Sequence, residues 1–361
     1  MFTVFWVATL TIAGLTFLPL WRDEAWWIRI QDFPRLQISV IALMMMLLET
    51  FVLDLSQART WGLLILMGLC FGYQAWWIVP YTRLFKVEVK PTATADSQRT
   101  LRIMTANVLT SNRNAPALLD LVHQHRPDLL VTLESDRWWQ EQLDTLQAEY
   151  SHTIKCPLDN LYGMHVYSRL PLSESRIAYL VEPGKPSMHA LIKLPSGQSI
   201  RGHFLHPAPP GPTKNEASTE RDAELVIVAK SVADVDMPVI VTGDLNDVAW
   251  SETTRLFRKI SGLLDPRVGR GMFNTFHADY WFMRWPLDHL FHSDHFTLSA
   301  LKRLRGFGSD HFPLLTELVL ERDERSQQEG IDADPDDRAW AESKARSEHV
   351  DKNDTPEPEK N

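Results

Sequence analysis

The chain has 361 residues, of which 44% are hydrophobic and 23% are charged, and its formal net charge is −9. Residues 323–361 carry 13 acidic and 6 basic side chains, a net charge of −7, so the other residues sum to only −2. That near-neutral remainder lacks the strongly basic surface of a dedicated nucleic-acid-binding protein, although a local basic patch would not change the sum. The two cysteines, Cys70 and Cys156, exclude a disulfide-stapled scaffold.

Residues 1–90 are predicted to form a membrane region, because they contain three long apolar segments, at 2–20, 36–55 and 61–81. Each is long enough, or nearly so, to cross a hydrocarbon core that needs about 20 residues of helix. The middle segment contains Glu49, which we expect to face the bundle interior or to lie near an interface. A helix lying on the membrane surface is the alternative for this segment. The sequence therefore predicts about three transmembrane helices.

Basic residues favour one orientation of these helices. They follow the first and third segments and are rare on the opposite side, being Arg22, Arg29, Arg35, Arg83, Lys86 and Lys90 against Arg59 alone. The positive-inside rule then places the N-terminus outside and the rest of the chain in the cytoplasm, at an inner or cell membrane. If the middle segment does not cross, the charge bias no longer decides the side.

The remaining chain is predicted to contain a linker, a globular domain and a tail. Residues 91–99 are expected to be a short flexible linker that suspends the globular domain near the bilayer. Residues 100–322 alternate between strand and helix patterns, which predicts β-sheet flanked by helices. Strands are expected at 101–108, 129–133, 164–167, 190–194, 199–205, 239–241 and 314–320, and helices at 116–125, 216–233 and 253–260. Residues 323–361 are too polar to offset their ordering entropy, so we expect an acidic disordered tail.

Polar side chains gather where buried strands of the globular domain are expected to end. They are Asn107, Glu134, His206, Asp244, Asn246, Asp288, Asp310 and His311. Ligands of α/β proteins bind at such strand ends, and acids, amides and imidazoles together suit metal-assisted attack on a phosphate. A single Asp-x-Asn is more often a capped turn. The repetition at several strand ends argues against that interpretation.

The order and contexts of these residues resemble the endonuclease/exonuclease/phosphatase superfamily, whose members include DNase I-like nucleases, repair nucleases, inositol-polyphosphate 5-phosphatases and neutral sphingomyelinases. The resemblance extends from about residue 100 to 321. The motifs that carry it are Thr105-Ala106-Asn107-Val108, Pro127-Asp128 with Glu134, Tyr167-Ser168-Arg169-Leu170-Pro171, Gly243-Asp244-Leu245-Asn246, Leu287-Asp288-His289 and Ser309-Asp310-His311. It implies a four-layer α/β sandwich, here preceded by transmembrane helices, and hydrolysis of phosphoester bonds with Mg²⁺ or Mn²⁺.

The resemblance also implies roles for individual residues. Glu134 would hold the divalent cation, with Asn107 as a ligand or beside it and Asp310 contributing. A metal of this kind prefers oxygen ligands.

In the catalytic group, Asp288 would orient His311, and either this pair or Asp244 would handle the proton of the attacking water. Asn246 would donate to a phosphate oxygen, and His206 would lie near the phosphate. The other histidines, such as His203, His289, His292 and His295, are expected to be structural or exposed, and Arg221 to be solvated or used in packing.

The substrate stays open between a lipid headgroup, a small molecule and nucleic acid. Aromatic residues between Phe273 and Trp285 could stack on bases, enter the bilayer interface or pack on the sheet. We therefore weigh a membrane-tethered phosphodiesterase or phosphatase against a metal-dependent nuclease acting on DNA or RNA. A membrane-anchored binding module that has lost turnover is the alternative of another class, and the full set of acids and histidines argues against it. The lipid bilayer is an expected partner, and no protein partner can be identified.

Overall fold

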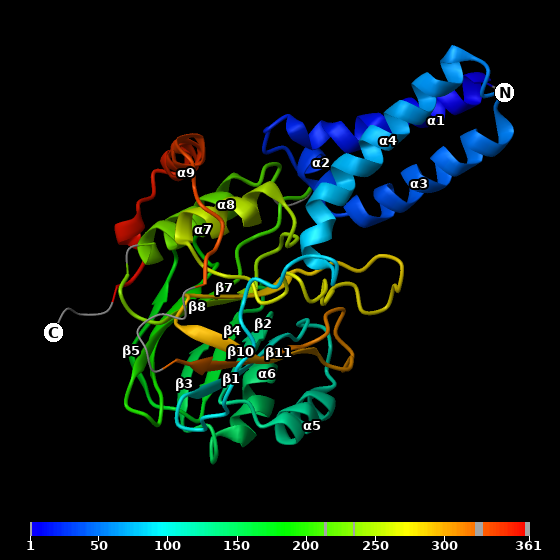
Figure 1. Cartoon of the computed structure of the whole chain (residues 1–361). Coiled ribbons are helices and arrows are strands. Elements are labelled where there is room, and N and C mark those ends of the chain that lie inside the picture. The colour runs from blue at the N-terminus through cyan, green and yellow to red at the C-terminus, as the bar shows by residue number, and fades with distance from the viewer. Residues whose placement is uncertain (1, 213–214, 234, 322–327, 358–361) are drawn as a thin grey trace.

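The computed structural model describes residues 2–212, 215–233, 235–321 and 328–357. A bundle of N-terminal helices projects from one side of an α/β sandwich, and the N-terminus lies at the far tip of the bundle (Figure 1). The bundle contains α1 (Phe2–Phe17), α3 (Arg35–Val52) and α4 (Ala58–Ile78), while the short α2 (Trp26–Arg29) lies at its base.

Three helices in the described part of the chain are long and apolar enough to cross a membrane: Phe2–Leu20, Arg35–Val52 and Ala58–Tyr81. The middle helix packs with the other two instead of lying apart from them. Glu49 is buried inside the bundle, where its Oε1 accepts a 2.9 Å hydrogen bond from the hydroxyl of Thr9. The side chain thus faces inward, which is one of the two positions expected for it.

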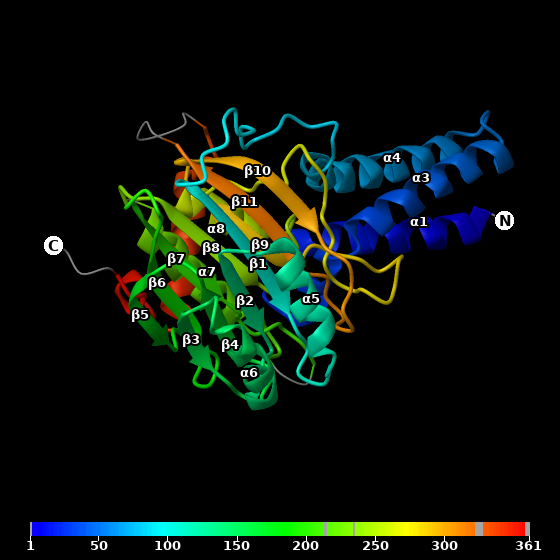
Figure 2. The ribbon, with the colours of Figure 1, turned by 90° about the horizontal axis from the view of Figure 1, so that it is seen from below.

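Two sheets make up the sandwich and lie face to face (Figure 2). The first has the order β10-β11-β1-β2-β4-β3 and the second has the order β5-β6-β7-β8-β9. The strands of the first sheet are β1 (Thr100–Asn107), β2 (Leu129–Leu133), β3 (His152–Cys156), β4 (Met164–Ser168), β10 (Phe296–Arg303) and β11 (Leu314–Leu320). Those of the second are β5 (Leu172–Ala178), β6 (Ser187–Lys193), β7 (Ser199–Leu205), β8 (Val239–Asp244) and β9 (Asp288–His292).

Helices cover the outer face of each sheet, which gives the four layers. The first sheet carries α5 (Ala115–His125) and α6 (Arg137–Leu143), and the second carries α7 (Thr219–Val232), α8 (Glu252–Ser261) and α9 (Pro335–Ser347). Short 3-10 turns complete the elements, at Leu18–Leu20, Ile30–Asp32, Val79–Tyr81, Asp144–Leu146 and Lys352–Asp354. A buried cluster from both inner faces fills the centre of the sandwich. The predicted four-layer α/β sandwich is confirmed.

Side-chain alternation along the strands explains how the core and the site share the same faces. In β1, Leu101 and Ile103 point into the cluster between the sheets, whereas Met104 packs against the outer helices. The period of two therefore directs Asn107, at the end of β1, toward the opposite sheet. In β8, Ile240 lies in the same central cluster, so that Asp244 is directed inward in the same way.

The C-terminal segment departs from the prediction of disorder over residues 328–357. Its helix α9 begins with a capping box formed by Asp334 and Asp337, and Ala341 and Ala345 are buried against α7 and α8. Acidic residues of this segment form ion pairs with the lysines of α7 and α8, namely Asp337 with Lys259 and Glu342 with Lys230, each at 2.6 Å. Composition alone was misleading, because a narrow alanine face and paired charges suffice to dock this helix.

The segment expected to be a free linker is held at its start. The backbone N–H of Thr92 donates to the carbonyl of Leu298 on β10 at 3.0 Å. A side chain of the sandwich also holds the base of the bundle, because Trp250 Nε1 donates to the backbone carbonyl of Asp32 at 2.8 Å. The sandwich therefore sits directly against the bundle instead of hanging from it.

Candidate active site

One edge of the paired sheets brings most of the predicted site residues together. The parallel pairs β1–β2 and β7–β8 end there, and the antiparallel strands β9 and β11 begin there. Asp288 is opposite Asp244 in the register of β8 and β9. Asp288 therefore starts a strand and His311 lies before one, whereas the sequence pattern had suggested that both follow strand ends. Both residues still lie at the expected edge of the sheets, because an antiparallel strand starts where its neighbour ends.

The amide of Asn107 lies between two carboxylates. Its Nδ2 donates to Glu134 Oε1 at 2.9 Å and to Asp244 Oδ2 at 3.1 Å. Its Oδ1 accepts a 3.0 Å hydrogen bond from the backbone N–H of Leu109. Asn107 therefore orients both acids, and its own oxygen is used by the backbone. Of the two roles expected for it, this geometry fits a position beside the metal better than direct ligation.

Glu134 offers the donor atom that a divalent cation needs. The chain leaves β2 with a φ of 56° at this residue, which turns its side chain back toward Asn107. Its second oxygen, Oε2, is buried without a hydrogen-bond partner in the described residues. Burial, together with the negative charge of Asp244, raises the pKa of Glu134 to about 7 although the Asn107 hydrogen bond opposes the shift. A buried carboxylate oxygen without a partner is costly, so the site fits a bound hard cation such as Mg²⁺ or Mn²⁺.

His311 is held between two acids. Its Nδ1 is 2.8 Å from Asp288 Oδ2, and its Nε2 is 3.5 Å from Asp244 Oδ2. Burial alone would lower the pKa of His311, but the charges of Asp288 and Asp244 outweigh burial and raise it to about 10. Ligand atoms of these three residues lie within 4.8 Å of one another. The two carboxylates therefore favour the protonated form of the imidazole.

Asn246 and Asp310 adjoin this group. The backbone N–H of Asn246, a residue with a φ of 51°, donates to Asp244 Oδ1 at 2.9 Å. Its side-chain Nδ2 donates to the carbonyl of Pro207 at 2.9 Å, which leaves its second N–H for another acceptor. Asp310 lines the same cavity, and its charge acts on both Glu134 and His311.

His206 is adjacent to the group but does not line the cavity. It is buried, its ring packs against Tyr162 at a centroid distance of 5.3 Å, and its charge acts on Asp244. The other histidines named in the sequence are structural, as expected. His289, for example, is buried and hydrogen-bonds to Arg267 and to the carbonyl of Asp247.

The site opens into a cavity of about 870 Å³. Glu134, Asp244, Asn246, Asp310 and His311 form its floor, and Phe276, Phe282, Met283, Trp285 and Leu287 form one wall. The opposite wall comes from the N-terminal region, with Trp26, Arg29, Ile30, Gln31, Phe33, Pro34 and Gln37. Sequence reasoning missed this second wall, because these residues were interpreted only as part of the predicted membrane region.

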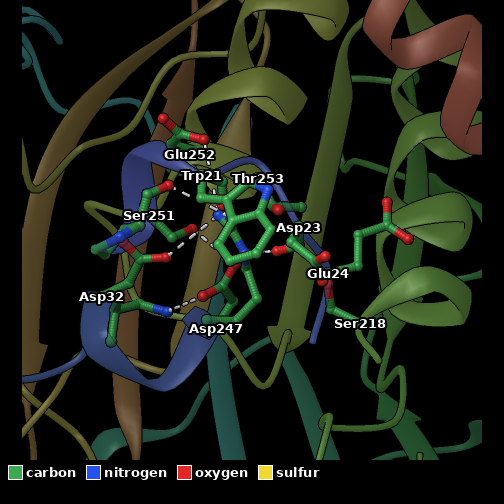
Figure 3. Close-up of polar contacts among 12 residues, drawn as sticks. Trp21, Asp23, Glu24, Asp32, Ser218, Asp247, Ser251, Glu252 and Thr253 are labelled. Carbon is green, nitrogen blue, oxygen red and sulfur yellow. Dashed lines mark hydrogen bonds and ion pairs between the residues drawn. The ribbon is translucent and has the colours of Figure 1, made fainter. Parts of the chain in front are cut away.

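A buried ionic network lies behind the floor of the cavity and joins it to the N-terminal region. Arg221 is fully buried and is not solvated, which is a correction to one of its expected roles. Its guanidinium donates to the carbonyl of Asn246 at 2.9 Å, and pairs with Asp222 at 2.9 Å and with Asp247 at 3.4 Å. Figure 3 shows Asp32, Asp247 and Glu252 close together, and Arg29 pairs with Asp32 at 3.8 Å and with Glu252 at 3.7 Å.

Asp222 extends the network to the C-terminal helix. Lys344 of α9 donates to Asp222 Oδ2 at 2.7 Å and to Glu24 Oε1 at 2.6 Å. The loop that follows Asp244 is therefore connected to both terminal regions.

Comparison with known proteins identifies the family. The sequence profile described as the endonuclease/exonuclease/phosphatase family matches residues 104–311, which is more than half of the chain. None of the curated proteins compared with the chain matches it.

Solved structures share the fold of the sandwich. A family protein from Bacteroides thetaiotaomicron has 20% identity and a TM-score of 0.52, over 62% of this chain and 98% of that one. The human Nocturnin catalytic domain has 16% identity and a TM-score of 0.51, over 63% and 97%. TDP2 from D. rerio, in complex with a single-strand DNA product, has 17% identity and a TM-score of 0.50, over 61% and 98%. The chain belongs to the endonuclease/exonuclease/phosphatase family.

Proposed function

We propose that this protein is a membrane-tethered phosphoester hydrolase of the phosphodiesterase or phosphatase type that depends on Mg²⁺ or Mn²⁺. The observation that carries the proposal is the convergence of Asp244, Asp288 and His311 beside the unpartnered oxygen of Glu134. Two acids holding an imidazole, next to a site for a hard cation, suit water attack on phosphorus.

Glu134 would hold the cation, with Asp310 near it and Asn107 fixing the carboxylate. When bound, the cation would polarise the phosphoester and offset its negative charge. Asp244 would accept the proton of the attacking water, because it lines the cavity and its carboxylate is held in place by the backbone N–H of Asn246 on Oδ1 and by the Asn107 amide on Oδ2.

His311, kept charged by Asp288, would stabilise the negative charge that develops on the phosphate oxygens. Asn246 would donate its second amide hydrogen to the same group. His206 would support Asp244 through its charge, from behind the cavity floor.

The three apolar helices support insertion in a membrane as a multi-pass protein. With three crossings the N-terminus and the sandwich lie on opposite sides, and the basic residues near the sandwich favour the cytoplasm for it. Protease treatment of spheroplasts tests the side. The sandwich should resist protease added from outside, and its digestion there would refute the cytoplasmic location.

Turnover by the full chain in lipid nanodiscs tests the reaction. We expect hydrolysis of ethyl p-nitrophenyl phosphate with Mg²⁺ or Mn²⁺, loss of activity with a chelator, and loss in Asp244→Asn and His311→Ala. Plasmid DNA and a single-strand oligonucleotide are tested in parallel, because preferred cleavage of either would favour the nuclease alternative. Absence of turnover on all substrates, with either metal, would favour a non-catalytic binding module.

A further inference from the structure

The cavity above the site has an unusual second wall, because that wall belongs to the membrane region. Residues 26–37 connect the first apolar helix to the second and include the first turn of the second. Several of them line the cavity together with the loop that contains Phe282 and Met283. The cavity that contains the candidate catalytic residues is therefore lined in part by residues at the base of the helical bundle.

This second wall is fixed in place. The backbone N–H of Trp26 donates to the carbonyl of Glu216 at 2.9 Å, and the N–H of Ser218 donates to the carbonyl of Glu24 at 2.8 Å. Across the cavity, Gln37 Nε2 on α3 donates to the carbonyl of Phe282 at 2.9 Å. The two walls therefore meet at the base of the bundle. The part of the cavity that lies between them, here called the channel, is held in place by these hydrogen bonds.

The upper part of the channel is apolar and open. Ile30 is 47% exposed, Phe282 is 54% exposed and Met283 is 42% exposed. The rings of Phe33 and Trp285, which line the same cavity, make an edge-to-face contact with their centroids 5.6 Å apart. Such a strip, rising from buried acids to exposed apolar side chains, matches a ligand with one charged end and one apolar end.

Charge on the walls does not suit a polyanion. Among the described residues that line the cavity, Arg29 is the sole arginine or lysine. Its guanidinium is already used by the backbone carbonyls of Asp23 at 2.7 Å and Trp21 at 2.8 Å, and it is buried. A nucleic acid needs cations along its backbone, whereas a single phosphoester needs only the site below.

From these observations we propose that the substrate is an amphiphilic phosphoester drawn from the bilayer. Its phosphate would lie against Glu134, Asp244 and His311, and its apolar chain would lie along Ile30, Phe282 and Met283 toward the membrane. The proposal rests on the phosphoester hydrolase function and adds the class of substrate to it. The N-terminal region then contributes to substrate binding as well as to anchoring.

A homologous series of alkyl p-nitrophenyl phosphates, from ethyl to octyl, tests the proposal on the full chain in nanodiscs with Mn²⁺. Burying one methylene completely is worth about fourfold in kcat/KM. We expect the octyl compound to exceed the ethyl compound by at least about tenfold, since burial along an open channel is partial. A flat response across the series would overturn the proposal.

A matched pair of variants tests where the alkyl chain of the substrate binds. Ile30→Ser changes a wall of the channel, whereas Ile177→Ser changes an isoleucine of similar exposure (40%) on β5, away from the bundle (Figure 1). Partition of the substrate into the nanodisc is the same for both variants and cancels. We expect Ile30→Ser to lower the octyl-to-ethyl ratio by about fivefold, as partial loss of one apolar side chain predicts, and Ile177→Ser to leave it unchanged. Equal ratios in the two variants would overturn the proposal.

Binding separates this inference from the proposed reaction. Octyl phosphate and ethyl phosphate are titrated against the full chain, with tryptophan fluorescence as the readout. Tighter binding of octyl phosphate that weakens in Ile30→Ser would support the channel even if no substrate is hydrolysed, and only the proposed reaction would then fail. Turnover of all esters with no preference for the octyl chain would leave the reaction standing and refute the channel. A higher kcat/KM for a single-strand oligonucleotide than for the octyl ester would also refute it.

Discussion

Replacing Arg221 with methionine should destabilise the protein strongly, although this residue is outside the cavity. Its guanidinium is buried and serves three acceptors, which are the carbonyl of Asn246 and the carboxylates of Asp222 and Asp247. Asp222 keeps Lys344 at 2.7 Å as a partner. Among the residues that the structure describes, Asp247 keeps only neutral partners, such as the Ser251 hydroxyl at 2.6 Å.

The expected cost is that of removing one member of a buried ion pair, about 3–5 kcal/mol. Burial already raises the pKa of Asp247 to about 6 although Arg221 opposes the shift, so without Arg221 this acid should take up a proton. For a domain of this size, each kcal/mol changes the melting temperature by about 2–4 °C, and Arg221→Met should therefore lower it by about 6–20 °C.

Thermal unfolding of the full chain in nanodiscs, followed by tryptophan fluorescence, measures this effect. Arg137→Met is the control, because Arg137 is exposed and pairs with Glu141 at 3.7 Å on the surface, an arrangement worth about 0.5 kcal/mol or less. The double variant Arg221→Met with Asp247→Asn should recover part of the loss, since it removes the unpaired acid. A melting temperature of Arg221→Met within about 2 °C of the wild type would refute the reasoning, since it equals a cost below about 1 kcal/mol.

Three further predictions concern the site and the core. Asp288→Asn should lower kcat by about 100- to 10,000-fold, because His311 loses the acid that orients it, whereas Asn in place of the exposed Asp279 should have little effect. Glu134→Gln should weaken Mn²⁺ binding by at least about tenfold in calorimetry, and a change in Glu149, an exposed acid, should not. Buried His189 should make the fold sensitive to acid, because burial lowers its pKa to about 3. The unfolded chain then binds the extra proton below pH 6.5, so this residue alone lowers stability by about 1.4 kcal/mol per pH unit on acidification from pH 6.5. His189→Gln should therefore make the melting temperature fall less steeply between pH 7.5 and 5, while other buried histidines with lowered pKa values, such as His289, keep part of the dependence.

Short apolar runs with turn residues beside them made the central strands predictable. The expected strands at 129–133, 199–205 and 314–320 coincide with β2, β7 and β11. Strands β3, β5, β9 and β10 were not predicted. Neither β3 nor β5 has a continuous apolar run, and β5 is mostly exposed. The place of these two strands in the sheets is set by pairing with β4 and β6. Such pairing is a property of the folded chain and leaves little trace in a local pattern.

The same limit explains which parts of the site were missed. Asn107, Glu134 and Asp244 could be found because each follows an apolar strand directly. Arg221 could not, because its partners lie in other segments and a helix pattern does not distinguish a buried arginine from a solvated one. Lys344 was assigned to a disordered tail on composition alone. Its two acceptors, Glu24 and Asp222, are distant in sequence from it and from each other.

The contacts around residues 245–251 argue that the N-terminal helical region supports the candidate site. Trp250 donates to the carbonyl of Asp32 at 2.8 Å, and the hydroxyl of Tyr81, at the end of the third apolar helix, donates to the carbonyl of Ala249. These residues directly follow Asp244 and Asn246, to which the proposed mechanism assigns the attacking water and the phosphate. A fragment without the first 90 residues would lose both contacts and one wall of the cavity. The N-terminal helices therefore shape the site, and a fragment without them should be a poorer catalyst even toward a substrate that never enters a membrane.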